Sequence, residues 1–142
     1  MLTSARNQFE GIVKSIKTGS VNDELSLEIA NGAIITAIIT KESTAHLGLT
    51  EGSQAFALVK ASSVILARDL EGVKLSTRNQ LSGTVTTLNR GAVNAEVALE
   101  IAQGLTITTI VTNQSVDNLG LAPGVKAVAI IKASQVIIGT KA

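Results

Sequence analysis

Residues 21–40 read VNDELSLEIANGAIITAIIT, two β-rich runs separated by Asn31 and Gly32. In the first run, apolar residues occupy alternate positions from 25 to 29, the period of a strand with one buried face. The second run, 33–40, is rich in isoleucine and threonine. Asn-Gly between two such runs favours a type I′ turn, because both turn residues need a positive φ. The stretch therefore predicts a β-hairpin.

The hairpin lies inside a longer pattern of strands. Residues 9–17 mix apolar and polar residues at a loose period of two, and residues 54–60 and 63–67 form shorter β-rich runs. Residues 40–48 begin with threonine and end with glycine, as a short helix does. The order strand, strand, strand, short helix, strand, strand is typical of five-stranded OB-type barrels.

The same pattern occurs twice in the chain. A shift of 72 residues (76 − 4) aligns Ser4 with Ser76 and Lys60 with Lys132 without a gap, and about half of the aligned positions are identical. The second copy has its turn at 103–104. We therefore predict an all-β chain with short helices, built as two tandem OB-like five-stranded barrels: a first module at 1–67, a linker at 68–75 and a second module at 76–142.

The size and composition of the modules predict a homo-oligomer. A domain of this size buries only about 60% of the surface of its unfolded chain. The chain has two Phe and neither Trp nor Tyr, so large side chains contribute little to either core. Packing of modules against each other and association of chains would both add buried surface.

The composition also argues against several classes of protein. A formal net charge of +1 and two aromatic side chains disfavour binding of nucleic acid by bulk charge or base stacking. The absence of cysteine excludes disulfides and thiolate metal sites. No run of about 18 apolar residues and no secretory signal pattern is present, so we expect a cytoplasmic protein without a membrane span.

Polar residues that the two copies share fall in three clusters. They are the strand-start cluster (Ser4-Ala5-Arg6-Asn7-Gln8 and Ser76-Thr77-Arg78-Asn79-Gln80), the helix-start pair (Thr40 with Ser43, and Thr112 with Ser115) and the turn cluster (Lys60-Ala61-Ser62 and Lys132-Ala133-Ser134). The shared set contains cations, hydroxyls and main-chain amides but no carboxylate, which suits an oxyanion. Helix starts add unpaired N–H groups. Glu42 is replaced by Gln114 in the second copy, so we expect it to point away.

A site made only of donors also discriminates between anions. Phosphate near neutral pH keeps a proton that requires an acceptor, whereas molybdate, tungstate and sulfate are fully ionised, and an unpaired buried polar group costs about 1 to 3 kcal/mol. Each cluster also has a structural interpretation. The arginines could be solvated, Thr40 and Ser43 could only cap a helix, Lys60 could lie on the surface and Ser62 in a turn.

Three segments carry a resemblance to a known family. TSARNQ at 3–8, IIT at 38–40 followed by Ser43 and LGL at 47–49, and KASSVILA at 60–67 resemble the molybdate-binding Mop domain of the molbindins, within the Mop/TOBE domain family. The likeness covers essentially the whole chain twice. It implies OB-like barrels, homotrimers of two-domain chains, and molybdate or tungstate held at module and subunit interfaces without an organic cofactor.

The resemblance also implies which residues hold the anion. In the first copy they are the side chains of Ser4, Arg6, Thr40, Ser43, Lys60 and Ser62, with the main-chain amides of Ala5, Asn7 and Ala61. In the second copy they are Ser76, Arg78, Thr112, Ser115, Lys132 and Ser134, with Thr77, Asn79 and Ala133 at the amide positions. Members of the family also hold anions on a threefold axis, where His46 is a candidate, although the second copy has Asn118 at that position.

The leading hypothesis is a cytoplasmic protein that binds molybdate, and tungstate as well, for storage and homeostasis. An enzyme is not expected, because the chain contains neither a P-loop nor a repeated set of Ser, His and acidic residues. One alternative is a molybdate-sensing component that acts through a partner, since related domains occur in transcription regulators. A ligand-free structural oligomer is another, in which the repeated Arg and Lys make salt bridges between subunits.

Overall fold

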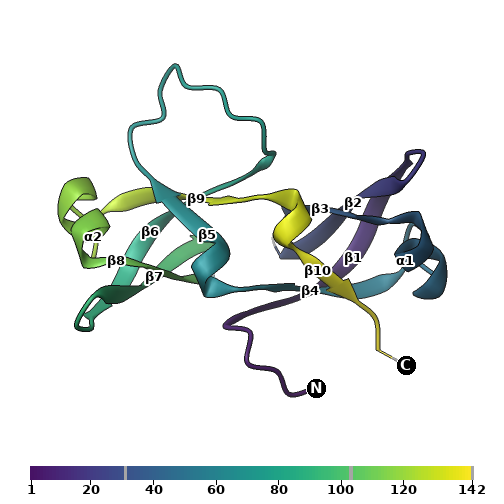
Figure 1. The fold of residues 1–142 in the computed structure, drawn as a ribbon, viewed down its shortest axis with the longest axis horizontal. Helices are drawn as coiled ribbons and strands as arrows, with labels where there is room; N and C mark the ends of the chain where they lie inside the picture. The colour runs from purple at the N-terminus through teal and green to yellow at the C-terminus, as the bar shows by residue number, and fades with distance from the viewer. Residues whose placement is uncertain (31, 103, 142) are drawn as a thin grey trace. The chain divides into compact units, whose positions relative to one another are not determined.

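The computed structural model describes residues 1–30, 32–102 and 104–141. The described chain consists of strands with two short α-helices and two 3-10 turns (Figure 1). In chain order the elements are β1 (Asn7–Thr18), β2 (Asn22–Ala30), β3 (Ala33–Thr40), α1 (Lys41–His46), β4 (Gln54–Val59), η1 (Ala61–Ser63), β5 (Val64–Ala67), β6 (Asn79–Arg90), β7 (Asn94–Ala102), β8 (Leu105–Thr112), α2 (Asn113–Leu119), β9 (Lys126–Ile131), η2 (Ala133–Gln135) and β10 (Ile137–Gly139).

The strands form two five-stranded antiparallel sheets, and each sheet curls into a half-barrel. The strand order is β10-β4-β1-β2-β3 in one sheet and β5-β9-β6-β7-β8 in the other. Each strand of the sequence pattern and each short helix is present. The predicted fold class, all-β with short helices and two OB-like five-stranded units, is confirmed.

The hairpin predicted from residues 21–40 is present. Strands β2 and β3 pair antiparallel from Asn22 opposite Thr40 to Ala30 opposite Ala33. Gly32 in the turn has a φ of 81°, the left-handed region that glycine adopts at low cost. The predicted turns also rest on Asn31 and Gln103, which lie outside the described residues.

The last strand of each repeat belongs to the other repeat's sheet. Strand β5 pairs with β9, with Val64 opposite Ile131, and β10 pairs with β4, with Ile138 opposite Ala57. The prediction that residues 63–67 complete the sheet of the first module is therefore wrong. An apolar run identifies a strand but not its partner, and the Val-Ile pair at the start of β5 recurs at 136–137 in the second copy.

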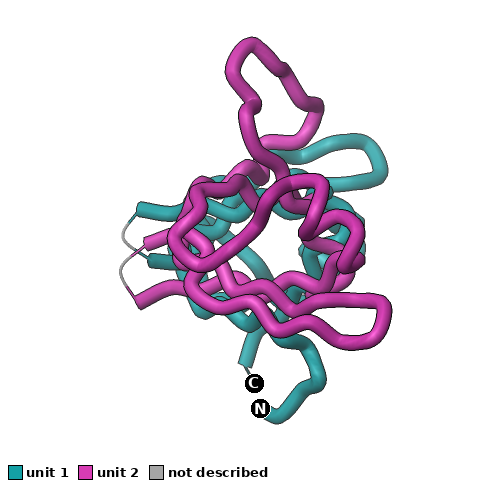
Figure 2. Tube along the Cα trace, turned by 90° about the vertical axis from the view of Figure 1, so that its left-hand side faces the viewer, with its two compact units in different colours: residues 1–59, 132–142 teal, residues 60–131 magenta. Residues whose placement is uncertain are grey.

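This exchange sets the two compact units of the chain (Figure 2). The first unit comprises residues 1–59 and 132–142, and the second comprises residues 60–131. The predicted boundaries at 67 and 76 thus describe the sequence repeat, whereas the compact units change at the end of β4 and the end of β9. The predicted linker, 68–75, belongs to the second unit. Its first residue, Arg68, donates a 2.9 Å hydrogen bond from Nη1 to the Leu119 carbonyl oxygen.

The two cores are largely aliphatic and share many matching positions. Leu25, Leu27 and Ile35 are fully buried in the first unit, as are Val97, Leu99 and Ile107 at the matching positions of the second. A Cβ on Gly11 would lie 2.2 Å from the Glu28 carbonyl oxygen, so the close approach of β1 and β2 at this point requires glycine. Among the helices of the described chain, none has the length and apolar character needed to cross a membrane.

Candidate functional site

Part of the strand-start cluster is structural. The Asn7 side chain is buried, and its Nδ2 donates a 3.2 Å hydrogen bond to the Val59 carbonyl oxygen across the β1–β4 pair. Asn79, the second-copy equivalent, is buried to the same extent. Gln8 Nε2 donates to the Ala5 carbonyl oxygen at 3.0 Å, which holds the turn before β1. Packing and turn formation therefore explain why Asn and Gln occur in both copies.

Two of the main-chain amides that the resemblance assigns to the anion have partners within the chain. The Ala5 N–H donates to Thr3 Oγ1 at 3.1 Å, and the Asn79 N–H donates to Thr77 Oγ1 at 3.2 Å. The Thr77 hydroxyl in turn donates to the Ile131 carbonyl oxygen at 2.7 Å. An anion would have to displace these bonds to use the two amides.

The cationic and serine side chains of the clusters lie at the surface. The exposed positions are Ser4, Arg6, Lys60, Ser62, Ser76, Arg78, Lys132 and Ser134. Ala61 is buried, and Ala133 is half-buried. Exposed cations can reach an anion on the surface of the unit that carries them.

The helix-start pairs cap the two short helices. Thr40 Oγ1 accepts the Ser43 N–H at 3.0 Å and donates to Ser43 Oγ at 2.8 Å. Thr112 and Ser115 repeat both bonds at 3.1 and 2.9 Å. Thr40 and Thr112 therefore cap their helices. The serine hydroxyl that accepts from the threonine keeps its own proton for donation to a ligand.

A groove of about 710 Å³ lies in the first unit between the end of β3, α1 and the segment around η2. Three serine and threonine residues of the clusters line it, namely Thr40, Ser43 and Ser134. Ser134 belongs to the second copy of the sequence. It reaches this groove because residues 132–142 are part of the first unit. The groove therefore combines hydroxyls from both repeats. The rest of its lining is largely aliphatic, with Ile38, Leu47 and Ile137 among the contributors.

The compact units divide the sets of ligands that the resemblance implies. The first unit contains Ser4, Arg6, Thr40 and Ser43 together with Lys132, Ala133 and Ser134, whereas the second contains Ser76, Arg78, Thr112 and Ser115 together with Lys60, Ala61 and Ser62. Each turn cluster thus accompanies the strand-start cluster of the other copy. Contacts of η2 with β3 and of η1 with β8 show the same arrangement in both units.

Two residues of α1 bring charge to the groove. Glu42 and His46 both line it, so the expectation that Glu42 points away is wrong. Residues at positions i and i+4 of a helix share a face, and this spacing was the signal that could have placed Glu42 beside His46. Among the described residues, no cluster of three or more His, Cys, Asp or Glu could hold a metal ion.

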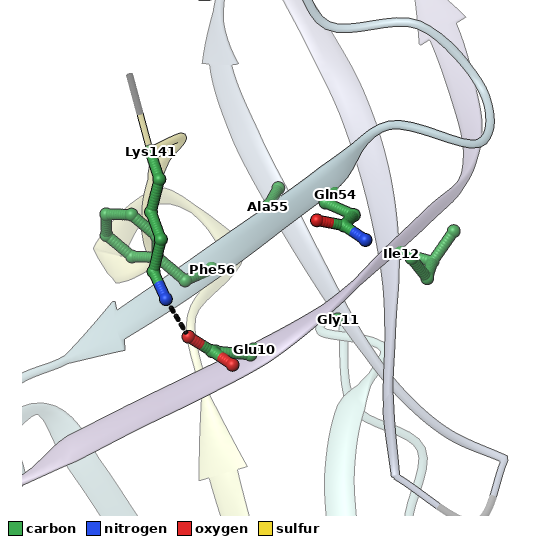
Figure 3. A pocket seen from close by; sticks show the side chains of 7 residues that line it. All are labelled: Glu10, Gly11, Ile12, Gln54, Ala55, Phe56 and Lys141. Carbon is green, nitrogen blue, oxygen red and sulfur yellow. Dashed lines mark hydrogen bonds and ion pairs between the residues drawn. The ribbon is translucent and has the colours of Figure 1, made fainter.

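A second hollow, of about 350 Å³, lies over β1 and β4 of the first unit (Figure 3). Glu10 and Lys141 form an ion pair at its rim, with 2.5 Å between Oε1 and Nζ. The hydrogen bond and positive charge of Lys141 hold the pKa of Glu10 below its usual range. The sequence clusters did not indicate this hollow, because its polar lining differs between the copies, with Ser82 at the position of Glu10.

Comparisons with known proteins identify the family. The model of the TOBE domain matches residues 3–66 and 75–138. The chain is 46% identical over 138 residues to the molybdenum transport protein ModE of Azotobacter vinelandii (97% of this chain, 51% of that protein). It is 34% identical over 140 residues to the DNA-binding transcriptional dual regulator ModE of Escherichia coli K12 (97% and 52%). The chain thus spans about half the length of these curated relatives.

A solved structure matches the chain over its whole length. The cytoplasmic molybdate-binding protein ModG, in a crystal form with molybdate bound, superposes with a TM-score of 0.96 at 47% identity, covering 99% of this chain and 100% of that one. The chain belongs to the TOBE domain family, of which it contains two tandem copies.

Proposed function

We propose that the chain is a molybdate-binding protein rather than an enzyme, and that it stores and buffers the anion in the cytoplasm. The observation that carries the proposal is the likeness to ModG with molybdate bound, which extends over the whole chain at 47% identity. The repeated clusters support it, because they supply cations and hydroxyl donors in both copies and share no carboxylate.

The proposed ligands do not all lie in one groove. Thr40, Ser43 and Ser134 line the first-unit groove, whereas Arg6 and Lys132 are absent from its lining. A dianion in a groove without a permanent cation would be weakly held, because exposed hydroxyls compete poorly with water for an anion. We therefore propose that the cations around one anion come from a further module or subunit, and that a homotrimer brings them together.

Molybdate and tungstate have the same charge and shape, so we propose that the same sites take tungstate. A set of donors without a hydrogen-bond acceptor disfavours hydrogen phosphate, whose proton would remain unpaired. The discrimination is weaker for sulfate, which is also fully ionised and differs from molybdate in size.

Equilibrium dialysis of the intact chain against molybdate, tungstate, sulfate and phosphate tests the proposal. We expect saturable binding of molybdate and tungstate and weak binding of phosphate. The variant Arg6→Ala with Arg78→Ala is expected to lose about tenfold or more in molybdate affinity, because each arginine contributes a charge-assisted hydrogen bond. Lys17→Ala with Lys74→Ala removes the same charge from exposed positions outside the clusters and is the matched control.

Light scattering after size exclusion tests the trimer separately. A trimer with and without molybdate supports sites that are shared between subunits. A monomer that binds molybdate with full affinity contradicts this part of the proposal and leaves the binding function intact.

The second candidate function is that of a molybdate sensor that acts through a partner. The observation in its favour is the likeness to the ModE regulator of Escherichia coli, a DNA-binding protein of which the chain spans about half. A gel shift with mixed oligonucleotides and a search for a protein that binds only the molybdate-loaded chain distinguish the two functions. Storage predicts release of the anion without either interaction.

A further inference from the structure

We propose that Glu42 and His46 make oxyanion binding in the groove of the first unit dependent on pH, and that the matching positions of the second unit bind independently of pH. The inference rests on the proposed function. It concerns how an anion site in the first unit differs from the matching site in the second unit. It starts from one observation, that the groove beside Ser43 and Ser134 is also lined by a carboxylate and an imidazole.

The geometry places both groups where an anion would feel them. Glu42 and His46 share one face of α1, and this face borders the same groove as the Ser43 hydroxyl. Both side chains are exposed. Neither forms a hydrogen bond or ion pair with another described residue, so their charges are not neutralised within the chain. A dianion in the groove would therefore interact with both.

The second unit repeats the scaffold without these charges. Thr112 and Ser115 reproduce the cap of Thr40 and Ser43, and η1 contacts β8 as η2 contacts β3. At the positions that match Glu42 and His46, the second copy has Gln114 and Asn118, two neutral amides. The two helix-start regions thus differ in charge, while the backbone dihedrals of their N-caps, Thr40 and Thr112, are nearly the same.

The other charged groups near α1 include a lysine that the second copy lacks, because Lys41 is matched by Asn113. Lys41 is exposed at the start of the helix. On β2, Asp23 is buried and its Oδ1 accepts from the Gly19 N–H, and Glu24 follows it. Strand β3 has no charged side chain, and the exposed Lys132 precedes η2. Among the described residues that line the groove, Glu42 and His46 are the ones with titratable side chains.

The direction of the effect follows from the chemistry of the two groups. A carboxylate stays ionised between about pH 6 and 8, whereas imidazole changes charge in this interval. The pair therefore goes from a net charge near zero at the acidic end to −1 at the alkaline end. A dianion is repelled more strongly at pH 8, so we expect its binding to the first-unit groove to weaken as the pH rises.

Equilibrium dialysis with molybdate at pH 6 and pH 8 tests the inference on the intact chain. The variant Glu42→Gln with His46→Asn gives the first copy the residues of the second. The reciprocal variant Gln114→Glu with Asn118→His does the opposite. Glu51→Gln removes an exposed carboxylate outside the groove and is the charge control. Thermal unfolding of each variant checks that the exposed substitutions leave the fold intact.

For the unmodified chain we expect one class of sites to bind molybdate about three to ten times more tightly at pH 6 than at pH 8. The first double variant is expected to lose this dependence, and the reciprocal variant is expected to extend it to both classes. Equal pH dependence in the unmodified chain and in the first double variant would overturn the inference, with molybdate binding itself retained. Absence of molybdate binding at both pH values would instead overturn the proposed function, and this inference with it.

Discussion

The hydroxyl of Thr109 on β8 donates a 2.8 Å hydrogen bond to the main-chain carbonyl oxygen of Val64, the first residue of β5. Thr109 is fully buried, and the first copy has Ala37 at this position. The bond attaches the end of the first sequence repeat to the sheet of the second. It therefore stabilises the strand exchange in one of the two units by a group that the other unit does not possess.

Replacement of Thr109 by valine tests this contribution. Valine keeps the shape of the side chain and removes the donor, so the Val64 carbonyl oxygen loses a buried partner. We expect a loss of about 1 to 3 kcal/mol in the free energy of unfolding, measured by urea denaturation. The matched control is Thr106→Val, at an exposed position of the same strand, for which a change of less than about 0.5 kcal/mol is expected. Equal effects of the two substitutions would contradict a role for the bond.

Substitution of the buried Asn7 tests whether its side chain stabilises the fold or binds the anion. Asn7→Ala removes the bond to the Val59 carbonyl oxygen and leaves a cavity, so we expect a loss of about 1 to 3 kcal/mol of stability. The folded protein should keep its molybdate affinity, because the buried side chain does not reach the surface. Asn89→Ala, at an exposed site on β6, is the control. A stable Asn7→Ala variant with weakened molybdate binding would show that this side chain acts as a ligand.

Substitutions of Thr40 can keep the helix cap while changing the charge at the groove. Asparagine and aspartate both cap helices well, so Thr40→Asn and Thr40→Asp should retain stability to within about 1 kcal/mol. The aspartate adds a negative charge at the groove and should lower molybdate affinity about tenfold relative to the asparagine variant. Thermal unfolding and dialysis measure the two effects. Similar affinities of both variants would argue against an anion near Thr40.

The ion pair of Glu10 and Lys141 predicts a local pH effect. Because Lys141 lowers the pKa of Glu10, the pair stabilises the folded chain above the usual titration range of glutamate, and this stabilisation is lost as the pH falls through the lowered pKa. Lys141→Met should raise the pKa of Glu10 toward its ordinary value, as measured by NMR titration of the carboxyl group. The effect on stability should be small, since both side chains are exposed. An unchanged titration of Glu10 would show that the pair does not form in solution.

The repeat explains why most of the fold could be predicted from the sequence. Three local signals predict the fold: the alternation of apolar residues in 25–29, the hairpin, and the glycine after each helix. Because the sequence is duplicated, each signal occurs in both copies. The partner of β5 could not be predicted, because the apolar run at Val64 identifies a strand but not the strand beside it. Pairing over long distances depends on tertiary contacts that a strand pattern does not encode.

The site was predicted less completely than the fold. The sequence predicts that Thr40 and Ser43 lie at a helix start, which the structure confirms, but it does not predict the groove that they line. The contribution of Ser134 to that groove depends on the strand exchange, so a comparison within one repeat could not show it. The second copy has Gln114 in place of Glu42, so a comparison of the repeats does not identify Glu42 as a groove residue, although it lines the groove.

The central claim is that the repeated cations and hydroxyls hold a tetrahedral dianion. Equilibrium dialysis of the intact chain against molybdate, compared with the Arg6→Ala and Arg78→Ala double variant, tests it most directly. The account predicts saturation at one anion or more per sequence repeat, and about tenfold or greater weakening in the variant. Saturation far below one anion per repeat, or equal binding by the variant in its folded state, would contradict it.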